Sequence, residues 1–247
     1  MGIGTASAQD DDTRVFNHLG AYAGFGTEGI SFGVATTITP YLELSAGANI
    51  FPSIKIDGDV DLNATSIQVP TSTGFETYNL ESINLKADLA RTMFDLKLSA
   101  YPFGGNSLFF VAAGLSMGGK EIAKLTGHSD DVARLYHDYP SYSGSIAAVV
   151  DKYSIDIDKQ GNAKGDIRVK SVRPYLGIGV GRMVPRHRVG FRFEAGCHFM
   201  GKPKVYQNDK EVDYSSALKE GDDDISKIVD KLTVYPVLKF TLTGRIF

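Results

Sequence analysis

The chain has 247 residues, of which 22% are charged, with a net charge of −3 and a pI near 6.0. This length suits one large all-β domain or two ordinary domains. A slightly acidic chain offers no basic surface for nucleic acid, so we expect no nucleic-acid partner. No apolar run approaches the roughly 20 residues that a membrane-spanning helix requires. A membrane β-barrel remains open, because only alternate residues of its strands face lipid.

The N-terminal segment resembles the end of a secretion signal. Residues 1–9 read MGIGTASAQ, and Ala6-Ser7-Ala8 fits the small-x-small pattern of a signal-peptidase site. We interpret residues 1–9 as a signal-peptide remnant and residues 10–247 as a single outer-membrane β-barrel domain. A polar N-terminus that resembles a cleavage site by chance is the alternative. The single cysteine, Cys197, has apolar neighbours and is expected to be buried or to face lipid.

Apolar residues alternate with polar ones along most of the chain, and this period of two predicts β-strands. In chain order, we expect eight strands near residues 18–25, 29–39, 41–51, 83–100, 108–117, 171–184, 189–200 and 232–247. In the fourth strand the apolar phase differs between its two halves, which predicts a β-bulge at 91–93. Each strand core reaches the roughly 9–11 residues that a tilted membrane strand needs.

The connections between these strands differ in length in a regular way. Those after the second, fourth and sixth strands are tight, at 39–40, 103–107 and 185–188. Those after the third, fifth and seventh are long, at about 52–82, 118–170 and 201–231, whereas the first connection is a short exception. Bacterial outer-membrane barrels have short periplasmic turns and long extracellular loops. Within the long loops, helical periodicity predicts a helix at 218–232 and, more weakly, one at 121–137.

The two faces of the expected strands differ in chemistry. One face is small, polar or charged, and its charges of both signs fall at similar depths, so they can pair inside a barrel as buried charges must. We predict a closed lumen with a charge network of Glu43, Asp95, Lys97, Arg192, Glu194 and Lys239. The other face predicts a lipid-facing belt that includes Phe191, Phe193, Phe199, Phe240 and Leu242. Alternation alone fits a soluble barrel of the reverse orientation equally well.

Three segments carry a family resemblance: SVRPYLGIGVG at 171–181, RVGFRFEAGCHF at 188–199 and VYPVLKFTLTGRIF at 234–247. They resemble the small outer-membrane β-barrels of the OmpA-transmembrane-domain and OmpX type, in the style common in Bacteroidota. The resemblance implies an eight-stranded antiparallel up-and-down transmembrane β-barrel with three long extracellular loops, in the outer membrane of a Gram-negative bacterium. It also implies outer-membrane lipid and the barrel insertion machinery as partners. Phe247 resembles the terminal aromatic that this machinery recognises, although it is out of phase with its strand.

No catalytic constellation stands out in the sequence. There is no Gly-x-Ser-x-Gly elbow, and the five histidines lack the short spacing of a zinc pair. We therefore expect no enzymatic activity, no cofactor and no metal. We expect surface loops that serve envelope integrity, adhesion or partner binding, with a candidate contact surface at Tyr136, Tyr139, Tyr142 and Tyr153, since tyrosine is favoured at interfaces. The alternatives are a narrow pore or small-ligand transporter, and a soluble lipocalin-like barrel that binds an apolar ligand.

Overall fold

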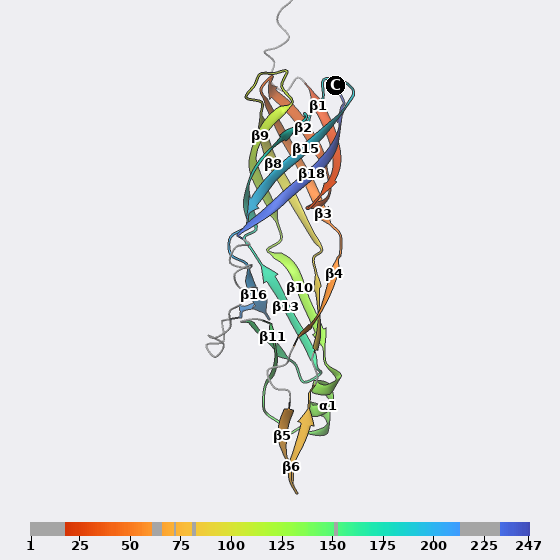
Figure 1. Ribbon diagram of the computed structural model, residues 1–247, viewed down its shortest axis with the longest axis vertical. Helices are drawn as coiled ribbons and strands as arrows, with labels where there is room; N and C mark the ends of the chain where they lie inside the picture. Colours follow the sequence, from red (N-terminus) through yellow and green to blue (C-terminus); the bar gives the residue numbers. More distant parts are fainter. Residues whose placement is uncertain (1–17, 61–65, 72, 81–82, 151–152, 213–232) are drawn as a thin grey trace, which may run out of the picture.

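The computed structural model describes residues 18–60, 66–71, 73–80, 83–150, 153–212 and 233–247. Figure 1 shows an elongated molecule in which two β-structures are stacked end to end. One of them is a closed barrel of eight antiparallel strands, in the order β1-β18-β15-β14-β9-β8-β3-β2. This confirms the predicted eight-stranded barrel. The proposed signal remnant at 1–9 and the helix predicted at 218–232 lie outside the described residues.

The barrel strands are close in position to the predicted ones. Their bounds are β1 (Leu19–Gly26), β2 (Gly29–Thr39), β3 (Leu42–Phe51), β8 (Arg91–Ala100), β9 (Phe109–Gly118), β14 (Val172–Val180), β15 (Val189–Phe199) and β18 (Val234–Arg245). The short turns after β2, β8 and β14 lie at one end of the barrel, which we call the short-turn end. The C-terminus lies at the same end in Figure 1.

The outer surface of the barrel is apolar and its interior is polar. Phe25, Ile30 and Phe191 point outward and are 62–65% exposed, whereas the alternate side chains on the inner face are largely buried. A soluble protein rarely leaves so continuous an apolar belt in water. This polarity is that of a membrane-spanning barrel. It rules out the soluble apolar-ligand carrier, which needs the opposite arrangement.

Glycine pairs make room inside the barrel for two large side chains. Gly177 and Gly196 face each other in register, and a Cβ on either would collide with the Tyr175 hydroxyl. Gly33 and Gly47 form a similar pair beneath the Tyr22 hydroxyl. An eight-stranded barrel is just wide enough for its own side chains, so such pairs let a tyrosine side chain lie against the inner wall of the barrel.

The long connections contain regular structure. They form a second sheet in the order β11-β12-β13-β10-β7-β4, to which β16 and β17 are joined beside β13, and a separate hairpin of β5 and β6. The bounds are β4 (Lys55–Val60), β5 (Ser66–Thr71), β6 (Gly74–Asn79), β7 (Ile83–Asp88), β10 (Glu121–His128), β11 (Ile146–Val150), β12 (Tyr153–Ile157), β13 (Asn162–Arg168), β16 (Lys204–Gln207) and β17 (Lys210–Glu211). We call these strands, together with helix α1 (Asp130–Asp138), the distal domain.

Helix α1 occupies part of the segment in which a weak helix was predicted; the rest of that segment is β10. The helix begins after Ser129, whose hydroxyl accepts a hydrogen bond from the Val132 backbone N–H at 3.4 Å. Asp130 and Asp131 in its first turn favour the positive end of the helix dipole. No helix in the described part of the chain has the length and apolarity needed to span a bilayer.

The distal domain has a hydrophobic core of its own. Ile83, Val132, Leu135, Ile146 and Ile155 are buried almost completely, and the hairpin adds Ile67 and Val69. Residues from α1, the sheet and the hairpin thus pack into one cluster. The segment that protrudes from the barrel is therefore a folded unit.

The β-bulge predicted at 91–93 is wrong. The chain leaves one sheet at the end of β7 and enters the barrel with β8, and β8 pairs with both neighbours without a shift of register. Odd-numbered residues are buried in both strands: Ile83 and Leu85 in β7, Asp95 and Lys97 in β8. The apolar phase changes because water surrounds β7 and lipid surrounds β8.

Candidate functional site

The six charged residues predicted for the lumen all lie inside the barrel, none of them more than 7% exposed. They come from four strands: Glu43 from β3, Asp95 and Lys97 from β8, Arg192 and Glu194 from β15, and Lys239 from β18. Alternation of side chains along each strand points them inward. They take part in three tiers of ion pairs stacked along the barrel axis.

The central tier joins β8 to β15. Lys97 Nζ lies 3.3 Å from Glu194 Oε1 and 3.3 Å from Asp95 Oδ2. Arg192 binds the other oxygen of Glu194 at 2.8 Å and donates to the Ser99 hydroxyl at 2.9 Å. These contacts satisfy both oxygens of a buried carboxylate with two cations.

A tyrosine completes the central tier. The Tyr175 hydroxyl donates to Glu194 Oε1 at 2.6 Å, and the Lys97 ammonium lies 3.7 Å from the centre of the Tyr175 ring. A cation over an aromatic face gains further stabilisation when water is excluded. The central tier therefore combines ion pairs with a ring that fills the space between them.

The second tier lies toward the short-turn end and centres on Glu43. Its carboxylate accepts from Arg182 Nε at 3.0 Å, from the Tyr101 hydroxyl at 2.5 Å and from the Met183 backbone N–H at 2.9 Å. The Arg182 guanidinium also stacks over the Tyr101 ring, 4.1 Å from its centre. Arg182 follows β14, whereas Glu43 lies on β3, so this pair crosses the lumen.

The third tier lies toward the distal domain and centres on Lys239. Its Nζ lies 2.7 Å from Glu28 Oε2, 2.8 Å from Asn49 Oδ1 and 3.6 Å from Asp95 Oδ2. His198 Nε2 lies 2.5 Å from the other oxygen of Glu28. Lys239 on β18 and Asp95 on β8 stand four strands apart in a ring of eight, so they meet from opposite walls.

Together the three tiers are balanced in charge. Four carboxylates, those of Glu28, Glu43, Asp95 and Glu194, face four cations, Lys97, Arg182, Arg192 and Lys239. Buried charges are tolerated when each finds a partner and further hydrogen bonds. The eight residues of these tiers therefore form a neutral, mutually paired network.

One part of this network has the residue types of a metal site. Glu28, Asp95 and His198 each offer a ligand atom, and these atoms lie within 4.8 Å of one another. However, the Lys239 ammonium lies against both carboxylates, so it already supplies the positive charge that a metal ion would bring. The arrangement fits an ion-pair cluster and does not suit a metal.

The charge network predicted from the sequence lacks Glu28, Arg182 and His198, and the prediction also omits Arg173, a buried cation that stands apart from the three tiers. Glu28 and Arg182 lie in turns, where strand alternation says nothing about direction. His198 and Arg173 follow the inward phase of their strands, so alternation could have found them. Arg173 is buried near the distal domain and donates to the carbonyl oxygens of Lys170 and Gly119 at 2.8 and 2.7 Å.

The residues predicted to face lipid lie on the outer surface. Phe191, Phe193, Phe199, Phe240 and Leu242 are 39–65% exposed. Phe240 contacts Phe25 and Phe191, with ring centres 5.7 and 5.9 Å apart. These rings form part of the continuous apolar belt on β1, β15 and β18.

Three of the four tyrosines named as a candidate contact surface pack against the distal core: Tyr136, Tyr139 and Tyr142 are half-buried there. Tyr136 donates to the Gly144 carbonyl oxygen at 2.6 Å. Tyr139 donates to the Glu76 carboxylate, and this hydrogen bond raises the pKa of Tyr139 to about 12. Tyr153 begins β12, and its side chain lies outside the described part of the structure.

Comparison with protein-family models and with curated proteins gives no match. Among solved structures, the chain is similar to the crystal structure of Acinetobacter baumannii CarO2, with a TM-score of 0.50 and 20% identity over 94% of this chain and 100% of that one. It also matches Acinetobacter baumannii CarO, with a TM-score of 0.44 and 21% identity over 91% of this chain and 96% of that one. The likeness to CarO2 is one of fold alone. The narrower resemblance to the OmpA and OmpX type stays a prediction.

Proposed function

We propose that this protein is a non-enzymatic integral protein of the outer membrane of a Gram-negative bacterium. Its closed barrel anchors the distal domain at the cell surface, where that domain serves adhesion, partner binding or envelope integrity. The filled lumen carries this proposal. A solute that crosses the barrel has to separate ion pairs that join opposite walls.

The energetic cost of separating these buried ion pairs supports a closed lumen. Removing one partner from a buried ion pair costs about 3–5 kcal/mol. A solute that passed all three tiers would disturb the partners of Glu43, Glu194 and Lys239 in turn. The Tyr101 and Tyr175 rings occupy space between the tiers. Side chains thus close the barrel at three levels.

The closed state is tested by recording currents across planar lipid bilayers that contain the purified protein. We expect no steady conductance from the wild-type protein. A variant with alanine at Glu43, Lys97, Arg192, Glu194 and Lys239 removes charged side chains from all three tiers and serves as the positive control for an opened lumen. Steady wild-type conductance would overturn the anchoring proposal and favour a narrow pore.

The distal domain is expected to face outward, because outer-membrane barrels keep their short turns in the periplasm. Two single-cysteine variants in a Cys197→Ser background test this: Lys159→Cys in the distal turn after β12, and Phe103→Cys in the short turn after β8. Both positions are exposed. In intact cells, a membrane-impermeant maleimide should label Lys159→Cys only. Labelling of Phe103→Cys alone would reverse the orientation.

A further inference from the structure

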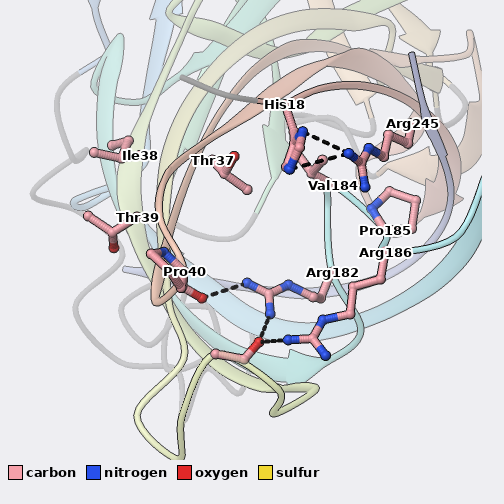
Figure 2. Close-up of a pocket in the computed structure, with 11 residues that line it drawn as sticks. His18, Thr37, Ile38, Thr39, Pro40, Arg182, Val184, Pro185, Arg186 and Arg245 are labelled. Carbon is pink, nitrogen blue, oxygen red and sulfur yellow. Dashed lines mark hydrogen bonds between the residues drawn. The ribbon is translucent and has the colours of Figure 1, made fainter. Parts of the chain in front are cut away.

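The mouth of the barrel at the short-turn end is strongly basic. A pocket of about 180 Å³ opens there, lined by Arg182, Arg186, Arg245 and His18 (Figure 2). The other seven lining residues are uncharged. One buried water molecule needs a cavity of roughly 10–15 Å³, so this pocket has room for a small ligand together with several water molecules.

Only one of the three arginines at this mouth has a carboxylate partner in the described part of the chain. Arg182 is paired with Glu43. Arg186 donates to the Gly105 carbonyl oxygen at 2.7 Å and to the side-chain oxygen of Asn106. Arg245 donates to His18 Nδ1 at 2.8 Å. Within the described residues, neither Arg186 nor Arg245 forms an ion pair with a carboxylate.

These contacts leave some guanidinium N–H groups of Arg186 and Arg245 without an acceptor among the described residues. A guanidinium has five N–H donors, and the neutral acceptors around Arg186 and Arg245 use only some of them. Arg182 and Arg186 both donate to the Gly105 carbonyl oxygen, but of the two only Arg182 has a carboxylate partner, Glu43, where the structure describes the chain. A bound anion would supply a counter-charge for Arg186 and Arg245 and accept hydrogen bonds from their unused donors.

We propose that the short-turn mouth binds an oxyanion of the phosphate type, with Arg186 and Arg245 as its principal ligands. Arginine suits this role because its planar fork donates parallel hydrogen bonds to phosphate oxygens. Thr37, which also lines the pocket, adds a hydroxyl donor. The phosphate can be free in solution or belong to a lipid headgroup, since the mouth lies at the end of the apolar belt. This inference does not depend on whether the lumen conducts.

The experiment has two arms, both with the full chain in a maltoside detergent, because phosphocholine detergents would themselves supply phosphate. In the first arm, inorganic phosphate is titrated into the protein by calorimetry. In the second arm, protein reconstituted in phosphatidylglycerol vesicles is extracted with maltoside, and retained phospholipid is counted by native mass spectrometry. The variants are Arg245→Gln and Arg186→Gln, with Arg188→Gln as a control of equal charge change outside the pocket.

We expect each pocket variant to weaken phosphate binding roughly tenfold or more and Arg188→Gln to leave it unchanged. Phosphate binding with this pattern supports a soluble ligand. Phospholipid retention with the same pattern, without binding of free phosphate, supports the site and assigns it to a headgroup. No binding in either arm, or equal binding by all variants, overturns the proposal. Arg186 is exposed and contacts only a turn, so its variant is expected to fold even if Arg245→Gln does not.

Discussion

Replacing Glu194 by glutamine removes one negative charge from the centre of the lumen and preserves the shape of the side chain. The glutamine oxygen can still accept the hydrogen bond that Tyr175 donates to Glu194 at 2.6 Å. Lys97 and Arg192, which lie 3.3 and 2.8 Å from the carboxylate oxygens, lose their shared counter-charge. The substitution therefore tests the ion pairs separately from the packing of the lumen.

The size of the effect follows from these distances. At an effective dielectric constant of about 20, a pair of unit charges 3.3 Å apart attracts by about 5 kcal/mol. Lys97 keeps Asp95 at 3.3 Å, and Arg192 keeps its hydrogen bond to Ser99, so part of this energy is recovered. We expect the free energy of unfolding to fall by about 3–5 kcal/mol, the usual loss when a buried pair is broken.

A matched control is Glu121→Gln in the distal domain. Glu121 pairs with Lys124 at 3.8 Å, and their side chains are 45% and 69% exposed. An exposed pair of this kind contributes about 0–1 kcal/mol. The two variants thus make the same chemical change, one inside the lumen and one in water.

Unfolding is followed in urea by far-UV circular dichroism and by the shift in gel migration on boiling, since the chain has no tryptophan. A destabilisation by Glu194→Gln no larger than that by Glu121→Gln would refute the reasoning. The lumen charges would then be solvated, and the barrel would hold a water-filled path.

Three further outcomes are expected. Phe240→Lys places a charge within the apolar belt and should destabilise the barrel by about 2–4 kcal/mol, whereas Thr126→Lys on the exposed face of β10 should have little effect; equal stabilities would contradict a lipid-facing belt. Leu135→Ala in the distal core should lower the stability of the distal domain by about 2–5 kcal/mol and make that domain sensitive to protease. The barrel of this variant should still show the shift in gel migration on boiling. Gly161→Ala should destabilise the β12–β13 hairpin by about 1–3 kcal/mol, because Gly161 has φ +81° and a Cβ would collide with the Ser129 carbonyl oxygen; unchanged proteolysis of this hairpin would count against that strain.

The barrel could be predicted because two local features of the sequence, the alternation of side chains and the lengths of the connections, define it. Alternation shows which residues share a face, and the difference in loop length shows which turns share an end. Glu194 and Lys97 were therefore assigned to one interior from two distant strands. The distal domain could not be predicted in this way, because its core depends on contacts between β7, α1 and the β5–β6 hairpin, which sequence periodicity does not relate. Likewise, Glu28 and Arg182 join the network from turns, where direction depends on the three-dimensional path of the chain.

The change of apolar phase near residue 90 shows that the alternation of apolar and polar residues in a strand depends on whether lipid or water surrounds it, and not only on the backbone conformation. In β7 and β8 the same parity is buried, yet the buried residues change from Ile83 and Leu85 to Asp95 and Lys97. A bulge would have changed the parity that is buried; here only the chemistry of the two faces is exchanged. The segment from β13 to β14 repeats this exchange, with Ala163 buried on one side and Arg173 on the other. In these two segments, an inversion of the apolar phase with unchanged parity therefore marks the level at which the chain leaves lipid and enters water.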